Sequence, residues 1–228
     1  MVKIKWLGHA AVLIQGSKRL LIDPYLKENP KAKIDINELA INYILITHGH
    51  PDHLGDAILL AKEKKVPVLA IFEITAYLQS KGISEIIPMN IGGKKYFEFG
   101  WVKMVPAVHS SSIIENERII YAGNSAGFVI NIDSKIIYVA GDTALFKDME
   151  LIGEILKPEI AVLPVGGNFT MDIEEAIHAT KILNVKKVIP VHYDTWDTIS
   201  TDIEEFKDKC KGCDVEPIIL EVNEEYEL

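Results

Sequence analysis

Short apolar runs separated by polar turns dominate the chain, and they predict a structure rich in β-strands. Most runs are rich in Val and Ile, the β-branched residues that favour strands, and polar or glycine-containing segments bound them. The run NYILIT is apolar almost throughout, which is typical of a strand buried on both faces. The pattern predicts strands at 2–8, 10–16, 19–24, 42–47, 66–71, 96–108, 119–122, 126–131, 135–140, 160–164, 187–191 and 217–221.

Longer segments with apolar residues at helical spacing lie between these strands. In HLGDAILLAKEKK (53–65), Leu54, Ile58 and Leu59 fall near one side of a helix. The segment EITAYLQSKG (73–82) has the same character and ends at a glycine. Strands interleaved with helices predict sheets covered by helices, and two facing sheets would explain why so many strands are apolar on both faces. Further helices are predicted at 144–156, 172–184 and 199–210.

The organisation of the chain predicts one domain over residues 1–228. No Ser- or Pro-rich linker divides the sequence, and no repeat is evident. Hydrophobic residues make up 48% and charged residues 25%, as in ordinary globular proteins. The length suits a domain with a sizeable core.

The net charge and the N-terminal segment indicate which partners and which cellular location to expect. The formal net charge is -9, and an acidic surface repels phosphate backbones, so nucleic acid is not the expected partner. The N-terminal segment MVKIKWLGH lacks a long apolar stretch, and no uncharged apolar run of about 18 residues occurs. We therefore expect a cytoplasmic protein without a membrane span, acting on a small molecule. A homo-oligomer is left open.

Candidate metal ligands follow the ends of several predicted strands. His48 follows NYILIT, His109 follows VKMVPAV, Asp142 follows KIIYVAG and His192 follows KKVIPV. Loops at the carboxyl ends of strands are where α/β architectures build their sites. Each residue alone could be an ordinary loop residue, but four in the same setting predict a shared site.

The segment ITHGHPDHLG holds three of the seven histidines in the chain. Its pattern H-x-H-x-D-H comprises His48, His50, Asp52 and His53. Imidazole and carboxylate are ligands that suit zinc, iron and manganese. Four candidate ligands in six positions exceed what one mononuclear catalytic site needs. They fit better when they are divided between two ions.

The segment THGHPDH resembles the T-H-x-H-x-D-H signature of the metallo-β-lactamase superfamily. The later ligands occur in the order that this family shows: a histidine after a strand, an aspartate in AGDT and a histidine in PVHYDTW. The opening WLGHAAVLI and the segment GGNFTM resemble a branch of small metal-dependent hydrolases. That branch is related to sugar-lactone lactonases and to N-acyl-phosphatidylethanolamine phospholipase D. The resemblance implies an α+β fold, a four-layer αβ/βα sandwich with a dinuclear metal site at one edge.

The resemblance also implies which residues bind the metals. The implied set is His48, His50 and His109 for one ion, Asp52, His53 and His192 for the other, and Asp142 bridging both. Flavodiiron relatives carry a glutamate at the place of the second histidine, which here is His50. The two divalent cations are therefore expected to be Zn²⁺, with Mn²⁺ or Fe left open.

Residues near the implied metals suggest further roles. In lactonase-like relatives a histidine at the place of His9 lies near the metals, so it could stabilise an oxyanion or donate a proton; the alternative is a packed hairpin histidine. Asn168 and Thr170, in LPVGGNFTMD, are expected to line the substrate site, and Asp172 to cap the following helix. Asp23 is either an acid behind the metal ligands or a turn former before a proline.

Three residues have weaker indications. Asp194 and Trp196 follow His192 and are candidates for the pocket or its surroundings. His178 lies in a predicted helix and is expected to be a surface or packing residue. Cys210 and Cys213 form a lone C-x-x-C pair without partners for a zinc site, so we expect two thiols at a helix end, with a disulfide as the alternative.

The sequence thus predicts a metal-dependent hydrolase that cleaves an ester, lactone or phosphodiester. A hydroxide bridging the two metals would attack, Asp52 would orient it, and His9 would act on the developing oxyanion. Two alternatives are a metal-bound regulatory or binding domain without turnover, and an RNA-processing nuclease. The acidic charge disfavours the nuclease.

Overall fold

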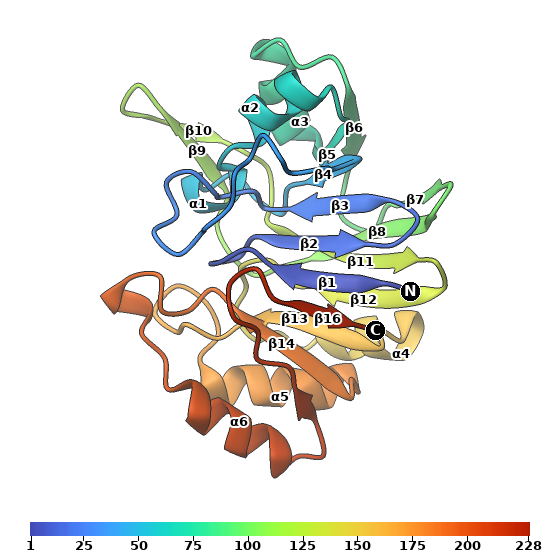
Figure 1. Ribbon diagram of the computed structural model, residues 1–228, viewed down its shortest axis with the longest axis vertical. Coiled ribbons are helices and arrows are strands. Elements are labelled where there is room, and N and C mark those ends of the chain that lie inside the picture. Colours follow the sequence, from blue (N-terminus) through green and yellow to red (C-terminus); the bar gives the residue numbers. More distant parts are fainter.

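The computed structural model describes residues 1–228 and contains two seven-stranded sheets that face each other (Figure 1). The first sheet has an antiparallel half, from β16 to β3, and a parallel half, from β3 to β6. Its strands, in spatial order, are β16 (Glu225–Glu227), β1 (Lys3–Trp6), β2 (Val12–Gln15), β3 (Arg19–Ile22), β4 (Tyr43–Leu45), β5 (Val68–Ile71) and β6 (Ile86–Met89).

The second sheet repeats this mixed arrangement. It is parallel from β15 to β12 and antiparallel from β12 to β7. A separate two-stranded ribbon of β9 (Ser112–Glu115) and β10 (Arg118–Tyr121) projects from the body (Figure 1). The strands of the second sheet, in spatial order, are β15 (Glu216–Pro217), β14 (Lys187–Val191), β13 (Ile160–Pro164), β12 (Lys135–Val139), β11 (Ala126–Ile132), β8 (Gly100–Pro106) and β7 (Lys94–Phe97).

Helices pack at the parallel half of each sheet. α3 contacts β5 and β6, whereas α5 contacts β13 and α6 contacts β15. One continuous cluster of buried apolar residues links both sheets and these helices, so the core lies between and beside the sheets. No helix has both the length and the apolar character needed to cross a membrane. The helices are α1 (Pro51–Leu54), α2 (Ala57–Lys64), α3 (Phe72–Ser80), α4 (Met149–Leu156), α5 (Ile173–Leu183) and α6 (Ile203–Lys211), with a 3₁₀ turn at Asp197–Ile199.

Most predicted elements are present, and the departures have local causes. The predicted helix 53–65 breaks at Gly55, which has φ +40° and whose backbone lies so close to Pro24 that a Cβ atom would stand 2.4 Å from the Pro24 oxygen. The predicted strand 96–108 is instead a hairpin of β7 and β8. Of the predicted strand 217–221 only Pro217 lies in a strand, at the end of the two-residue β15. The helices at 144–156 and 199–210 begin later than predicted, at Met149 and Ile203.

Three strands were not predicted. β6 contains a proline and lies at the edge of its sheet, where a missing N–H donor is tolerated. β9 belongs to the projecting ribbon and has only four residues, too few for a clear alternation of apolar and polar positions. β16 pairs with β1 from the opposite end of the chain, a long-range contact that no local pattern reveals.

Strand direction places the candidate ligands at one edge of the sandwich. The strands β1 and β4 of the first sheet run in the same direction, as do β8, β12 and β14 of the second, because an even number of antiparallel pairings, or none, separates them. Their carboxyl ends therefore meet at common edges. The residues that follow these ends are His9, His48, His109, Asp142 and His192.

Candidate metal centre

All seven predicted ligands come together at this edge of the sandwich. His48 and His53 are fully buried, and Asp142 is 3% exposed. The short helix α1 begins at Pro51, directly after His50, and brings Asp52 and His53 to the cluster within one turn. Because Asp52 and His53 lie in a single helical turn directly after His50, their side chains can point toward the same centre.

The first predicted triad forms a group of nitrogen atoms. The donor atoms of His48, His50 and His109 all lie within 4.8 Å of one another. His48 Nε2 lies 3.0 Å from His50 Nδ1, and His109 Nε2 lies 3.3 Å from the same atom. Such spacing is compatible with three imidazoles around one ion.

The second predicted triad forms a group with one additional member. Donor atoms of Asp52, His53 and His192 lie within 4.8 Å of one another, and His9 joins them. Asp52 Oδ2 stands 3.7 Å from His192 Nε2 and 3.8 Å from His53 Nε2. The structure therefore brings the predicted triad together and adds His9 as a fourth neighbour.

Asp142 lies between the two groups. Its Oδ1 atom is 3.3 Å from His53 Nε2, and its Oδ2 atom is 3.1 Å from His192 Nε2. On the other side, Oδ2 is 3.6 Å from His109 Nε2 and 4.0 Å from His48 Nε2. One carboxylate thus reaches both triads, which is the position that a bridging ligand requires.

The buried polar atoms of the cluster fit divalent cations. His53 Nε2, Asp142 Oδ1 and His192 Nε2 are buried and have no hydrogen-bond partner. Unpaired buried polar atoms cost free energy, so a cluster of them that converges on one space fits a bound cation. Five imidazoles and two carboxylates are a donor set that suits zinc, iron or manganese.

The pKa values of the ligands are shifted in different directions in the two triads. Burial lowers the pKa of His48, His50 and His109, which favours the neutral imidazole that binds metal. Burial also disfavours the charged form of His192, but the Asp142 carboxylate outweighs it and raises the pKa of His192 to about 9. For Asp142, the nearby His53 and His192 overcome burial and hold its pKa well below the usual range. The carboxylate is therefore ionised, as a ligand must be.

Asp23 orients His53 from behind. Its Oδ2 atom lies 2.8 Å from His53 Nδ1 and accepts the Thr47 hydroxyl at 2.6 Å, while its Oδ1 atom accepts the Thr47 N–H. This contact fixes the ring so that Nε2 points toward Asp142. Of the two interpretations left open for Asp23, the structure supports the acid behind the ligands. Thr47 also lies 3.0 Å from His48 Nδ1, a contact that the sequence did not predict.

We expect Asp23→Asn to lower metal affinity about 10- to 100-fold, as typically follows the loss of a carboxylate behind a histidine ligand. The reason is that an amide oxygen accepts the His53 N–H more weakly than a carboxylate does. Titration with a competing chelator measures the affinity. Asp202→Asn, which changes the cap of α6 far from the cluster, is the matched control. Equal affinities in the two variants would contradict the role of Asp23.

His9 is held in the cluster by both ring nitrogens. Its Nε2 lies 3.0 Å from Asp52 Oδ2, and its Nδ1 lies 2.8 Å from Thr195 Oγ1. The backbone is equally constrained, since φ is +54° and the His9 oxygen accepts hydrogen bonds from the Trp6 indole and the His192 N–H. Burial lowers the pKa of His9 to about 4, so the ring is neutral. Thr195 was missed by sequence reasoning, although it lies in the quoted segment PVHYDTW.

A cavity of about 600 Å³ opens onto the cluster. Aromatic side chains of Tyr25, Phe169 and Trp196 contribute to its wall, and neither Lys nor Arg is among the lining residues. From the loop 165–172 the lining residue is Phe169, whereas Asn168 and Thr170 on either side of it are not among the lining residues. A substrate contact by Asn168 or Thr170 stays a prediction.

The remaining sequence candidates have structural positions. Asp172 caps α5 by accepting the Glu175 N–H, as expected. Asp194 accepts the Thr201 N–H and so holds the loop after His192 in place. His178 is exposed on α5, and Cys210 and Cys213 are free thiols at the end of α6, without a disulfide.

Comparison with known proteins identifies the family. A β-lactamase superfamily domain matches residues 18–193. The chain belongs to the metallo-β-lactamase superfamily. Over the whole length of both chains it is 45% identical to a UPF0173 metal-dependent hydrolase of Nanoarchaeum equitans, and 43% identical to one of Archaeoglobus fulgidus over 100% of this chain and 99% of the relative.

Solved structures agree with this assignment. The fold is similar to that of Igni18, a metallo hydrolase from Ignicoccus hospitalis, with TM-score 0.89 and 34% identity over 100% of this chain and 99% of that one. The metallo-β-lactamase fold protein YhfI from Bacillus subtilis shares the fold at TM-score 0.75 and 12% identity, covering all of both chains. The predicted fold is confirmed, and the protein is a metal-dependent hydrolase of this superfamily.

Proposed function

We propose that the protein binds two divalent cations, Zn²⁺ first among them with Mn²⁺ or Fe as alternatives, and hydrolyses an ester, lactone or phosphodiester of a small molecule. The observation that carries this proposal is the convergence of buried, unpaired ligand atoms around Asp142, at the base of an open cavity. His48, His50 and His109 would hold one cation, Asp52, His53 and His192 the other, with Asp142 shared.

Bound cations of this kind supply an activated water and polarise the substrate oxygen. The protein's own groups then have distinct tasks. Asp52 Oδ2, close to His53, His192 and His9, is placed to orient the attacking water. The Asp52 carboxylate can only accept a hydrogen bond, so His9 carries its proton on Nε2 and donates it to Asp52 Oδ2, while Nδ1 accepts the Thr195 hydroxyl. His9 is fully buried and does not line the cavity, so this N–H would stabilise negative charge on the reacting oxygen only when Asp52 turns away toward a bound cation.

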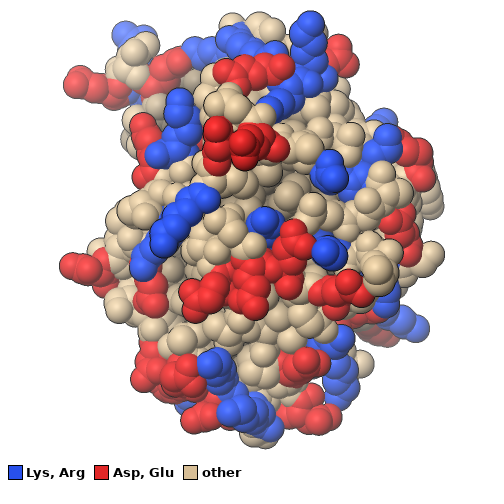
Figure 2. Space-filling view, viewed as in Figure 1, with Lys and Arg blue, Asp and Glu red and all other residues tan.

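The charges around the cavity favour a small molecule over RNA. The cavity wall carries no Lys or Arg, whereas binding of a nucleic acid requires several cationic contacts. On the face shown in Figure 2, acidic side chains form a band across the middle, with Lys and Arg scattered around it. These features support the small-molecule proposal. A cytoplasmic location stays a prediction.

The proposal is tested by measuring turnover of p-nitrophenyl acetate, a γ-lactone and bis-p-nitrophenyl phosphate. We expect at least one to be hydrolysed by protein reconstituted with Zn²⁺ or Mn²⁺, and the activity to disappear after treatment with a chelator. Restoring the metal should restore the rate. Absence of metal-dependent turnover on every substrate would favour a binding or regulatory domain instead.

We expect two metal ions per chain after reconstitution, because seven ligand side chains form two triads around a shared carboxylate. Elemental analysis of the desalted protein measures the stoichiometry. A value near one would show that one triad releases its ion readily. A value of zero would contradict the proposed metal centre.

A further inference from the structure

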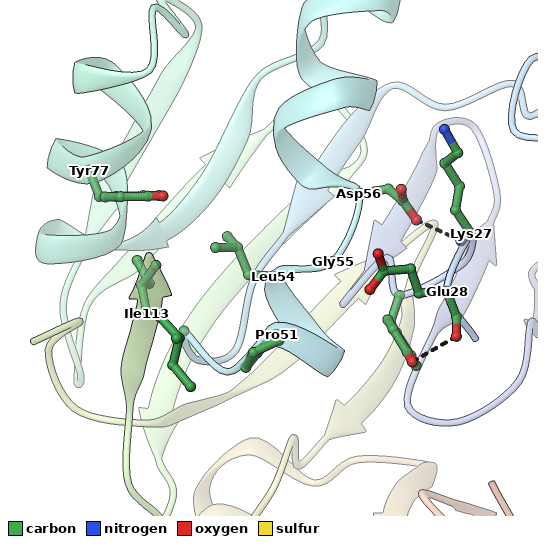
Figure 3. A pocket seen from close by; sticks show the side chains of 11 residues that line it. Lys27, Glu28, Pro51, Leu54, Gly55, Asp56, Tyr77 and Ile113 are labelled. Carbon is green, nitrogen blue, oxygen red and sulfur yellow. Dashed lines mark hydrogen bonds between the residues drawn. The ribbon is translucent and has the colours of Figure 1, made fainter. Parts of the chain in front are cut away.

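A second cavity, of about 530 Å³, adjoins the metal cavity, and Figure 3 shows the side chains that line it. The two cavities share three lining residues, Tyr25, Glu28 and Pro51, so they adjoin along a common rim. We call the second cavity the α1 groove. Each volume alone falls within the range of small-molecule sites, about 300–1,000 Å³.

Helix α1 separates the α1 groove from the reaction centre. Asp52 lines the metal cavity, whereas Leu54 lines the α1 groove (Figure 3). The chain packs tightly on both sides of the helix, because a Cβ atom at Gly55 would meet the Pro24 oxygen and one at Gly49 would stand 2.6 Å from Ala122 Cβ. Residues larger than glycine would not fit at either end of α1, and the helix lies between the groove and the metal ligands.

The α1 groove is apolar at the end that faces α3 and β9, and its other end carries the charged side chains of Lys27, Glu28 and Asp56 (Figure 3). Leu54 and Tyr77 contribute from the helices and Ile113 from β9 (Figure 3), and Ile114 of β9 also lines the groove. Ile114 is 59% exposed, although it lines a concave surface where a ligand could cover it. An isoleucine that is this exposed on the wall of a groove gains free energy when an apolar group packs against it.

The charges of both cavities disfavour an anionic substrate tail. The metal cavity has no Lys or Arg. The α1 groove has one cation, Lys27, and two carboxylates, Glu28 and Asp56. Asp56 is already engaged, since its Oδ2 accepts the backbone N–H groups of Leu26 and Lys27. A phosphate or carboxylate on the tail would meet a net negative wall, whereas an uncharged apolar chain would not.

We propose that the substrate carries an uncharged apolar tail that lies in the α1 groove while its ester, lactone or phosphodiester group lies at the metals. The inference rests on the proposed function and names the part of the substrate that the metal chemistry leaves open. Continuity of the two cavities carries it, because a molecule bound at the metals can extend over Pro51 into the groove without leaving the protein surface.

The test is a chain-length series on the metal-loaded full chain. The probes are p-nitrophenyl esters from acetate to octanoate and the matching alkyl p-nitrophenyl phosphates, with the rate of Asp142→Ala protein subtracted as background. We expect kcat/KM of the preferred head group to rise about two- to fourfold for each added CH₂ that enters the groove. Esters with a terminal carboxylate should lose this gain.

Ile114→Ser should reduce the ratio of octyl to shortest-chain kcat/KM about tenfold. Ile119→Ser is the matched control, because Ile119 pairs with Ile114 across the ribbon, is 79% exposed and does not line the groove. The control should keep the wild-type ratio. A flat series in the wild type, or equal losses in the two variants, would overturn the proposed tail site while metal-dependent turnover still supports the hydrolase. No metal-dependent turnover of any probe would overturn both.

Discussion

Asp142→Ala should abolish hydrolysis and empty both metal sites. The carboxylate lies within 4.0 Å of His48 on one side and within 3.3 Å of His53 on the other, so in the proposed two-metal centre its loss would remove the ligand that both ions share. Loss of a residue that merely supports a ligand typically costs 10- to 100-fold in metal affinity or activity, and a ligand shared by two ions should cost at least about a thousandfold in kcat/KM. Steady-state kinetics and elemental analysis of the same preparation measure both effects.

Two further variants make this result specific. Asp142→Asn keeps the shape of the side chain and removes its charge, so it should lose metal without unfolding. His178→Ala should retain full metal content and rate, because His178 is exposed on α5. Wild-type metal content in Asp142→Ala would contradict the bridging position, whatever its activity.

His9→Ala should lower kcat by about two to three powers of ten and leave the metal content unchanged, which is the usual cost of removing one donor to an oxyanion. The contacts of His9 explain why kcat should fall while the metal content stays unchanged. Its Nδ1 is engaged by Thr195 and its Nε2 faces Asp52, so both nitrogens have partners within the protein. His9→Gln should recover part of the rate if hydrogen bonding, rather than proton transfer, is the contribution.

Thr195→Val tests the role of His9 without changing His9 or any predicted metal ligand. It keeps the shape of the side chain and removes the hydroxyl that orients the imidazole, so it should lower kcat in the same direction as His9→Ala but less. Loss of metal from His9→Ala would make His9 a ligand of the second site. Wild-type rate and metal content would make it a packed histidine, and the proton donor would then be Asp52, since Asp194 holds a loop.

Local chemistry let the sequence predict much of the candidate site. His48, His50, Asp52 and His53 are adjacent in the chain, so their grouping needs only a tight turn. His109, Asp142 and His192 lie directly after apolar strands, and strands that run in one direction deliver their carboxyl ends to one edge of a sheet. The alternation of strands and helices predicted the layers for the same reason, because burial of an apolar face is encoded within each element.

The tertiary structure alone decided the surroundings of those ligands, because they depend on segments that are far apart in the chain. Asp23 reaches His53 across 30 positions, and Thr195 reaches His9 across 186. The break in the predicted helix 53–65 arises from the approach of Pro24 to Gly55, which no periodicity records. The α1 groove likewise exists only where the loop after β3, the helices α1 and α3 and the ribbon strand β9 pack together, since a cavity is a property of packed surfaces and not of any one segment.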